Sequence, residues 1–417
     1  MHARALGADG NPAVAVSPDG ASVYVAGDGL AIFSRDSSSG ALRQPPSTNG
    51  CVQRRGAAGC LVDQRLADPE AIALSPGGES VYVASAVENR RLGQSCNCAV
   101  VGFSRELSTG ALRPIGGSAG CAARIGNERC GFARAIGFPT AVLVSPEGRN
   151  VYLASSAGIA TLARDPGTGE VNQPAGNQGC VSDLVSGCMR VRGLCGTTSL
   201  SMSPDGRSLY AGSARAQAMV VFERNPSTGA LRQPAGQAGC IAVRGLYGCR
   251  RSRIALTRPH VMVAPDGRNV YVASDNWRVK DGFGPLRGAK SPAIATLARD
   301  TTTGALRPLP GRAGCFGLRP GCAKPHEKVL NLTALGISPD ARNLYATNAT
   351  YAVASRQGYP VLVFSRNQQT GAIREIEPGR AGVFSDSILP VALSIAPDGR
   401  DVYVTFQSSA LAIYRRT

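Results

Sequence analysis

The sequence is organised around a short turn motif that recurs along its whole length. Its first copy is Ser17-Pro-Asp-Gly20; an apolar run precedes it and an alternating run, Val23–Ala26, follows it. Proline presets φ at the second position of a tight turn and Asp-Gly completes the turn, so each copy predicts a β-hairpin. The copies share the apolar run on one side and the alternating run on the other, and they begin at Ser17, Ser75, Ser145, Ser203, Ala264, Ser338 and Ala396.

Each repeat continues with two further strand-like segments. In the first repeat a third apolar stretch, Leu30–Arg35, ends in arginine, a turn follows at Gly40, and a short fourth strand is expected at Ala41–Arg43. Seven repeats of four antiparallel strands predict an all-β fold, a seven-bladed β-propeller of four-stranded antiparallel blades. A β-sandwich is the alternative, but the repetition spans the whole chain. We therefore expect residues 1–417 to form a single domain.

The two ends of the chain suggest how the ring closes. The seventh repeat stops after its third strand, Ala410–Tyr414, whereas the segment Ala3–Leu6 before the first hairpin resembles a fourth strand. We expect this N-terminal strand to complete the last blade, because closure removes the exposed edges that an open array leaves.

Thirteen cysteines bear on the compartment of the protein. Ten form close pairs at equivalent places, just after each of five fourth strands, and their spacing favours disulfides in an oxidising compartment. We therefore expect a secreted or extracytoplasmic protein. No secretory signal is visible at Met1, so either the chain is a processed form or this expectation is wrong. The pairing of Cys96, Cys98 and Cys195 stays open. The predicted bridges are Cys51–Cys60, Cys121–Cys130, Cys180–Cys188, Cys240–Cys249 and Cys315–Cys322.

Metal and cofactor sites are not expected. The cysteine gaps are wider than those of zinc motifs, and the histidines His2, His260 and His326 are scattered. The sequence contains no phosphate-binding loop. It also contains no apolar stretch long enough to span a membrane.

The topology of the repeats predicts a basic working surface. Both short turns of a blade are expected on one face of the propeller. The longer loops, which contain all the cysteines, are then expected on the other face. Ordered loops often carry function, so we expect the working surface there. With a net charge of +17, an anionic partner is expected: a glycan, an acidic protein or a small phosphorylated or carboxylated ligand. Nucleic acid is disfavoured because no binding motif accompanies the charge. The predicted ligand-binding residues, all basic and in one part of this loop face, are Arg244, Arg250, Arg251, Arg253 and Arg278.

One group of residues has the chemistry of a hydrolytic site. Most repeats have alanine or serine five residues before the turn proline, but the fifth has His260. Folding that hairpin brings Asp275 to the same end, and Arg258 precedes the histidine by two residues. If the first strand is innermost, this end of the hairpin lies at the mouth of the propeller's central channel. A histidine, a carboxylate and an arginine there are suited to activate water and hold an anion. A polar channel lining without catalysis is the alternative.

The repeated motifs resemble those of a known family. The run around Ser203-Pro-Asp-Gly206 and the Thr-Gly-Ala-Leu segment at 303–306 look like the seven-bladed lactonase-type propellers, which include 6-phosphogluconolactonases. The repeat is also similar to the Tyr-Val-Thr-Asn propellers of microbial surface proteins. Lactonases of this type carry an Arg-His pair and a Glu; His260 matches the histidine, Asp275 lies at the glutamate position, and Arg258 is displaced by one residue.

Two functions follow as hypotheses. The first is an extracellular propeller that binds or scaffolds a partner through a basic loop face held by disulfides. The second, implied by the resemblance, is a lactone hydrolase that uses His260, Asp275 and Arg258. We favour the first.

Overall fold

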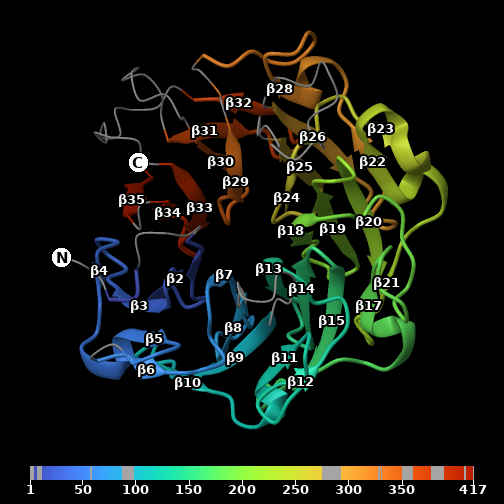
Figure 1. Ribbon diagram of the computed structural model, residues 1–417. Helices are drawn as coiled ribbons and strands as arrows, with labels where there is room; N and C mark the ends of the chain where they lie inside the picture. The colour runs from blue at the N-terminus through green and yellow to red at the C-terminus, as the bar shows by residue number, and fades with distance from the viewer. Residues whose placement is uncertain are drawn as a thin grey trace. The chain divides into compact units, whose positions relative to one another are not determined.

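A computed structural model describes residues 4–6, 12–56, 59–86, 98–274, 293–326, 329, 331–349, 360–376, 389–407 and 410–416. Within these residues the strands form seven separate sheets in chain order, and the few helical segments are short 3-10 turns (Figure 1). The protein is therefore the all-β, seven-bladed β-propeller that the repeats predict. The chain divides into two compact units, which are described separately: residues 1–190, 225–230 and 393–417, and residues 191–224 and 231–392.

The first unit contains the first three blades and the last two strands of the seventh. In each of these three blades a tight turn, which contains Pro18, Pro76 or Pro146, joins the first strand to a fully buried second strand. The bounds are β1 (Val14–Val16), β2 (Ser22–Ala26), β3 (Leu30–Arg35), β4 (Leu42–Arg43), η1 (Ser47–Gly50), β5 (Cys51–Gln53), β6 (Leu61–Val62), β7 (Pro69–Leu74), β8 (Ser80–Ser85), β9 (Ala99–Arg105), β10 (Leu112–Pro114), η2 (Ser118–Gly120), β11 (Cys121–Ala123), β12 (Gly131–Phe132), β13 (Pro139–Val144), β14 (Asn150–Ser155), β15 (Gly158–Arg164), β16 (Val171–Asn172), η3 (Gly176–Gly179), β17 (Cys180–Val181), β34 (Asp401–Phe406) and β35 (Leu411–Arg415).

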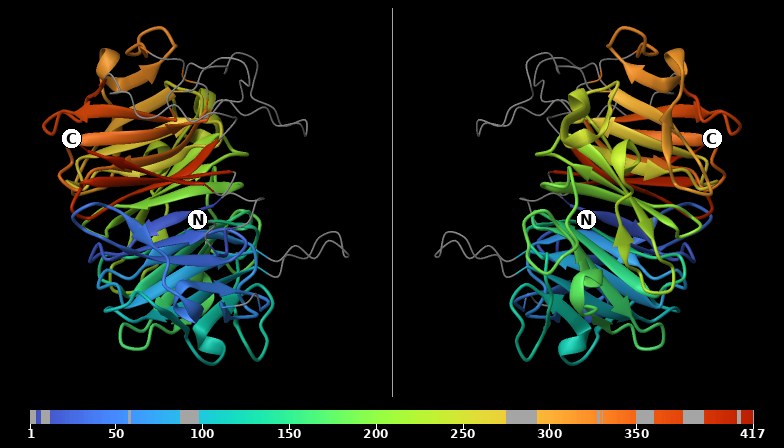
Figure 2. Two further views of the ribbon diagram at one scale, coloured as in Figure 1. Left: turned by 90° about the vertical axis from the view of Figure 1, so that its left-hand side faces the viewer. Right: turned by 90° about the vertical axis from the view of Figure 1, so that its right-hand side faces the viewer.

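The second unit contains blades four to six, and β33 (Pro390–Ile395) lies across the division. Figure 2 shows these strands from two further sides, with the 3-10 turns drawn as coiled ribbons. The bounds are β18 (Thr197–Met202), β19 (Ser208–Ser213), β20 (Ala218–Arg224), β21 (Leu231–Arg232), η4 (Gly236–Gly239), β22 (Cys240–Ala242), η5 (Val243–Gly248), β23 (Arg250–Arg251), β24 (His260–Val263), β25 (Asn269–Ser274), β26 (Ala293–Arg299), β27 (Leu306–Pro308), η6 (Gly311–Gly314), β28 (Cys315–Gly317), β29 (Leu332–Ile337), β30 (Asn343–Asn348), β31 (Val361–Arg366) and β32 (Ile373–Glu375).

The hydrophobic core lies between neighbouring sheets. Val81 and Val83 of β8 pack with Ile32 of β3, and Val270 and Val272 of β25 pack with Val221 of β20. Because these second strands are buried on both faces, they are continuous apolar runs broken mainly by one tyrosine. Burying one large apolar side chain stabilises the fold by roughly 1.5–3 kcal/mol, and this free energy holds each blade to the next within a unit.

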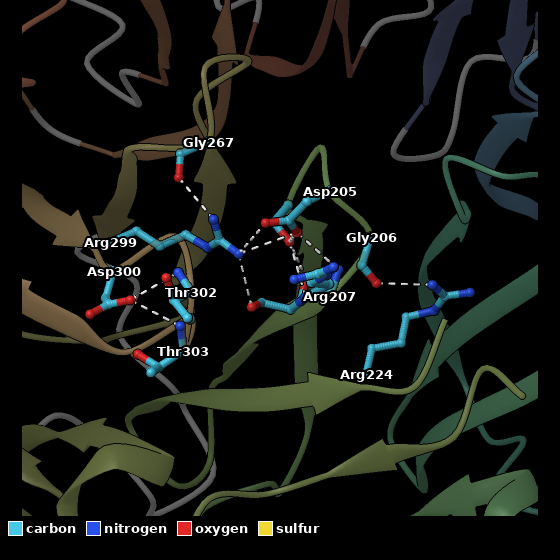
Figure 3. A network of polar contacts seen from close by, with 12 residues as sticks. Asp205, Gly206, Arg207, Arg224, Gly267, Arg299, Asp300, Thr302 and Thr303 are labelled. Carbon is cyan, nitrogen blue, oxygen red and sulfur yellow. Dashed lines mark hydrogen bonds and ion pairs between the residues drawn. The ribbon is translucent and has the colours of Figure 1, made fainter. Parts of the chain in front are cut away.

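Buried arginines also join adjacent blades. In five blades the arginine that ends the third strand donates from Nε to the tyrosine hydroxyl of the preceding blade, and that hydroxyl donates to a glycine carbonyl in the arginine's own blade. In the second unit Arg299 donates to Tyr210 at 2.9 Å, and Tyr210 donates to Gly304 at 2.8 Å. Figure 3 shows the guanidinium of Arg299 between the Gly267 carbonyl and the Asp205 carboxylate. The equivalent pairs in other blades are Arg35–Tyr403, Arg105–Tyr24, Arg164–Tyr82 and Arg366–Tyr271.

The outer part of the disulfide-bearing blades is more elaborate than four strands. In blade 1, β4 pairs with the end of β3, η1 interrupts the strand, and β5 then pairs with the start of β3. A fifth short strand, β6, runs parallel to β5, and the Cys51–Cys60 disulfide links the start of β5 to the residue before β6. The five predicted pairings are confirmed. Their expected position is corrected: these disulfides lie at the last edge of each sheet rather than within loops of one face, because the fourth strand resumes at the first cysteine.

The N-terminal segment also differs from the expectation. Among its described residues, Arg4 and Ala5 form a turn, and Ala5 packs against the Cys51–Cys60 pair of blade 1. The Arg4 guanidinium donates to the carbonyls of Pro45, Ser47 and Gly59 in the same blade. The described part of Ala3–Leu6 is therefore an anchor on blade 1, and the seventh sheet has three strands in the described residues.

Candidate functional site

The basic surface is built from the disulfide loops of blades 4 and 5 in the second unit. It consists of the exposed or half-exposed basic residues Arg244, Arg250, Arg251, Arg253, Arg312, Arg319 and Lys324. Neither segment that carries them, 240–258 or 309–324, contains an aspartate or glutamate. An uncompensated group of cations of this kind creates a positive potential that attracts anions.

Two arginines hold these neighbouring loops together. Arg253 donates from Nη1 to the Leu309 carbonyl at 2.9 Å, and Arg319 donates from Nη1 to the Arg253 carbonyl at 2.8 Å. The Cys240–Cys249 and Cys315–Cys322 disulfides close the two loops. The cationic groups thus project from one cross-linked frame, which lowers the entropy lost when a ligand orders them.

The predicted binding residues divide into three kinds. Arg244 is exposed within η5, and Arg250 and Arg251 form β23, so all three remain available to a ligand. Arg253 is exposed, but one of its guanidinium nitrogens donates to the Leu309 carbonyl of blade 5. Arg278 lies outside the described residues.

Other loop arginines serve the fold. Arg134 follows the disulfide segment of blade 2 and donates to the carbonyls of Pro174, Gly176 and Gly187 in blade 3. Arg65 donates to the Ile115 carbonyl and pairs with Asp63 at 2.8 Å. The high arginine content of the loops therefore overstates the charge that is free to bind, because part of it caps backbone carbonyls of the next blade.

His260 begins β24, the first strand of blade 5, and is half-buried. Its register partner is Ala273, two residues before Asp275, so the hairpin does bring this end of β25 to the histidine. Ser199, the equivalent residue of blade 4, donates to the Pro259 carbonyl at 2.8 Å and accepts from the Val261 N–H at 3.1 Å. Hydroxyl side chains thus satisfy the free backbone edge of the strand that carries His260.

The electrostatic setting keeps His260 neutral. Burial, and then the positive charge of Arg258, lower the pKa of His260 to about 4. Arg258 is exposed and has a positive φ of 45°. A neutral imidazole can accept a proton or a hydrogen bond at pH 7, but its low pKa makes it a weak base. Asp275, the predicted carboxylate partner, lies outside the described residues.

Glu70 is another partly buried titratable residue with a shifted pKa, and it was not singled out from the sequence. It lies in β7, the first strand of blade 2 in the first unit, where the pairing with β8 shifts between Pro69 and Ala71. A bulge redirects a side chain, and the same shift occurs next to Thr140 and Thr198 in other blades. Burial, together with the charge of Asp68, raises the pKa of Glu70 to about 7. The available signal was a carboxylate at a repeat position that is otherwise proline, threonine or valine.

Two kinds of feature are absent from the described residues. These residues contain no cluster of three or more histidine, cysteine, aspartate or glutamate residues that could hold a metal ion. None of their helices is long and apolar enough to cross a bilayer. Cys98 is disulfide-bonded, Cys96 lies outside the described residues, and Cys195 packs against the Cys240–Cys249 region.

Comparison with known proteins adds information about the fold. The sequence matches no protein-family model and no curated protein. Among solved structures, a putative 6-phosphogluconolactonase from Bacteroides uniformis is 15% identical, with 97% of this chain and 92% of that chain covered and a TM-score of 0.58. The periplasmic gluconolactonase PpgL of Pseudomonas aeruginosa is 18% identical, with 98% and 92% covered and a TM-score of 0.57. Hydrazine synthase of Kuenenia stuttgartiensis is 14% identical, with 99% and 98% covered and a TM-score of 0.55.

These similarities define the class of fold. The structure matches the lactonase-type seven-bladed β-propellers at low sequence identity, as the repeat motifs indicated. The same fold also occurs in a protein described as a hydrazine synthase. Because one fold hosts unrelated activities, function has to be argued from the site.

Proposed function

We propose that this protein is an extracytoplasmic binding protein that holds an anionic partner on the basic surface of blades 4 and 5. One observation carries the proposal: two disulfide-closed loops, joined through Arg253 and Arg319, present basic side chains from segments without a single carboxylate. The five disulfides support an oxidising compartment, and the similarity to a periplasmic gluconolactonase is consistent with it.

The direct test is binding to a sulfated polysaccharide, with heparin as the probe, over a range of salt concentrations. Replacing Arg244, Arg251 and Lys324 together by serine spares Arg253 and Arg319, which hold the frame. We expect at least a roughly tenfold loss of affinity and a salt dependence shallower by about one unit of slope per lost contact.

The matched control removes the same charge elsewhere. Arg43, Arg113 and Arg400 are exposed outside the basic surface, and replacing them by serine lowers the net charge equally. If this variant loses as much affinity as the first, binding follows net charge and the proposed surface is wrong.

Lactone hydrolysis is the second candidate function. A specific observation favours it: a half-buried histidine, neutral at pH 7, begins the first strand of blade 5, in a fold shared with proteins described as lactonases. In this reaction His260 would take a proton from water while a nearby cation holds the lactone's anionic group.

The test compares the wild type with His260→Ala and Asp275→Ala on glucono-δ-lactone and its 6-phosphate. Loss of hydrolysis in both variants, with unchanged thermal melting, would establish the enzyme. A wild-type rate equal to the uncatalysed rate on both substrates would exclude hydrolysis of these two lactones.

A further inference from the structure

Three large apolar side chains project from the basic surface. Leu246 and Tyr247, which are 41% and 52% exposed, lie between Cys240 and Cys249, and Leu318, which is 60% exposed, lies between Cys315 and Cys322. Single exposed apolar residues are common on proteins. Here they lie at the tips of neighbouring disulfide loops and beside basic residues, since Arg244 precedes Leu246 by two positions and Arg319 follows Leu318.

The backbone holds these tips outward. Tyr247 and Arg244 both have positive φ values, 59° and 57°, which non-glycine residues rarely adopt without support. That support comes from the disulfide, from the Cys249 N–H that donates to the Leu246 carbonyl at 3.0 Å, and from Arg192, which donates to the Tyr247 carbonyl at 3.1 Å. The apolar side chains are therefore fixed away from the core by covalent and polar restraints.

Apolar residues that share loops with basic residues indicate the chemistry of the partner. Arginine pairs with phosphate, whereas exposed leucine and tyrosine gain free energy by leaving water for the boundary between headgroups and acyl chains. A sulfated glycan matches the charge but offers little to the apolar tips. An anionic bilayer surface matches both features.

We propose that the basic surface docks on an anionic lipid bilayer, with Leu246, Tyr247 and Leu318 inserted into its interface. This inference rests on the proposed function and specifies the partner. The lipid phosphates would lie against Arg244, Arg251 and Lys324. Two disulfide loops of the first unit also expose an apolar side chain, Ile125 in the Cys121–Cys130 loop and Leu184 in the Cys180–Cys188 loop. Each of these loops also contains an acidic residue, Glu128 or Asp183, which the loops of the basic surface lack.

The experiment is co-sedimentation of the full chain with vesicles. One set contains phosphatidylcholine alone and the other equal parts of phosphatidylcholine and phosphatidylglycerol. We expect the wild type to bind only the anionic vesicles, and the triple variant Leu246→Ser, Tyr247→Ser, Leu318→Ser to bind them at least about tenfold more weakly. The same variant should bind heparin within about twofold of the wild type, because its charge is unchanged.

A control variant replaces three exposed apolar residues of the first unit, Leu107, Leu184 and Ile413, by serine. It should bind the anionic vesicles like the wild type. Heparin binding without binding to anionic vesicles would overturn this inference and leave the proposed function intact. Equal vesicle binding by the apolar triple variant and the wild type would also overturn it. Absence of binding to both heparin and vesicles would remove the proposed function itself.

Discussion

Arg299 and Tyr210 form a buried contact between blades 5 and 4, with 2.9 Å between the arginine Nε and the tyrosine hydroxyl oxygen. The hydroxyl in turn donates to the Gly304 carbonyl, so one pair connects the second strand of blade 4 with the third strand and the outer turn of blade 5. Arg299 also pairs with Asp205 at 2.9 Å. A charge this deeply buried is tolerated because its donors meet a carbonyl, a hydroxyl and a carboxylate.

The first prediction concerns this arginine. Arg299→Ala leaves Tyr210 and the Gly267 carbonyl without their donor, and we expect it to lower the free energy of unfolding by about 3–5 kcal/mol. The measurement is urea unfolding followed by circular dichroism. Arg307→Ala, an exposed arginine on the next strand, should change stability by less than about 0.5 kcal/mol. Similar losses in the two variants would contradict a structural role specific to Arg299.

A second prediction concerns acid stability. Burial alone would raise the pKa of Asp205, but hydrogen bonds from Ser203, from the Arg207 N–H and from Arg299 lower it below its ordinary value. A carboxylate with a lowered folded-state pKa contributes stability above its unfolded pKa and loses it as the pH falls through the folded value. Asp205→Asn should therefore be less stable than the wild type at pH 7, and the difference should shrink below about pH 4. Urea midpoints at pH 7 and pH 3 test this, and a constant difference would contradict it.

Glu70 should show the opposite dependence. Its pKa is raised to about 7 in the folded protein. Between the ordinary pKa of a glutamate and this value, Glu70 is protonated in the folded protein but ionised in the unfolded chain. The stability from Glu70 is complete at acidic pH and is lost as the pH rises through 7. Relative to the wild type, Glu70→Gln should gain about 1–2 kcal/mol between pH 5 and pH 8, a reduced figure because the carboxyl is partly exposed. Thermal melting across this range is the measurement, with Glu106→Gln on an exposed turn as the control.

Much of the fold follows from local chemistry that the sequence displays. The Pro-Asp-Gly turns appear where expected, with Gly20 at φ 70° and its N–H bonded to the Ser17 carbonyl. Five cystine pairs were predictable because each pair recurs at one place in the repeat and closes a short loop. Period-two patterns, turn residues and spacing are all local signals, so one sequence suffices to interpret them.

The site depended on contacts that no local pattern contains. Arg65 and Arg134 lie in loops like those of the predicted binding residues, but their guanidinium groups donate to carbonyls of the next blade, 50 to 53 positions further along the chain. The parallel fifth strand β6 has only two residues, too few to give a period. Glu70 differs from the equivalent residues only at a bulge, and its raised pKa depends on burial that the sequence does not state.

The last prediction separates stability from binding by means of two equivalent disulfides. Cys240–Cys249 closes a loop with a sequence separation of 9 and carries the basic surface, whereas Cys180–Cys188 has a separation of 8 and lies in the first unit. Loops of nearly equal length restrict the unfolded chain by nearly the same amount, so replacing either pair by alanine should cost about 2–3 kcal/mol. Only the Cys240→Ala, Cys249→Ala variant should release Arg244 and Tyr247 from their positive-φ conformations. We therefore expect similar decreases in melting temperature but a loss of heparin affinity in that variant alone, measured well below both melting temperatures. Equal affinity in the two variants would show that the conformation of this loop does not matter for binding.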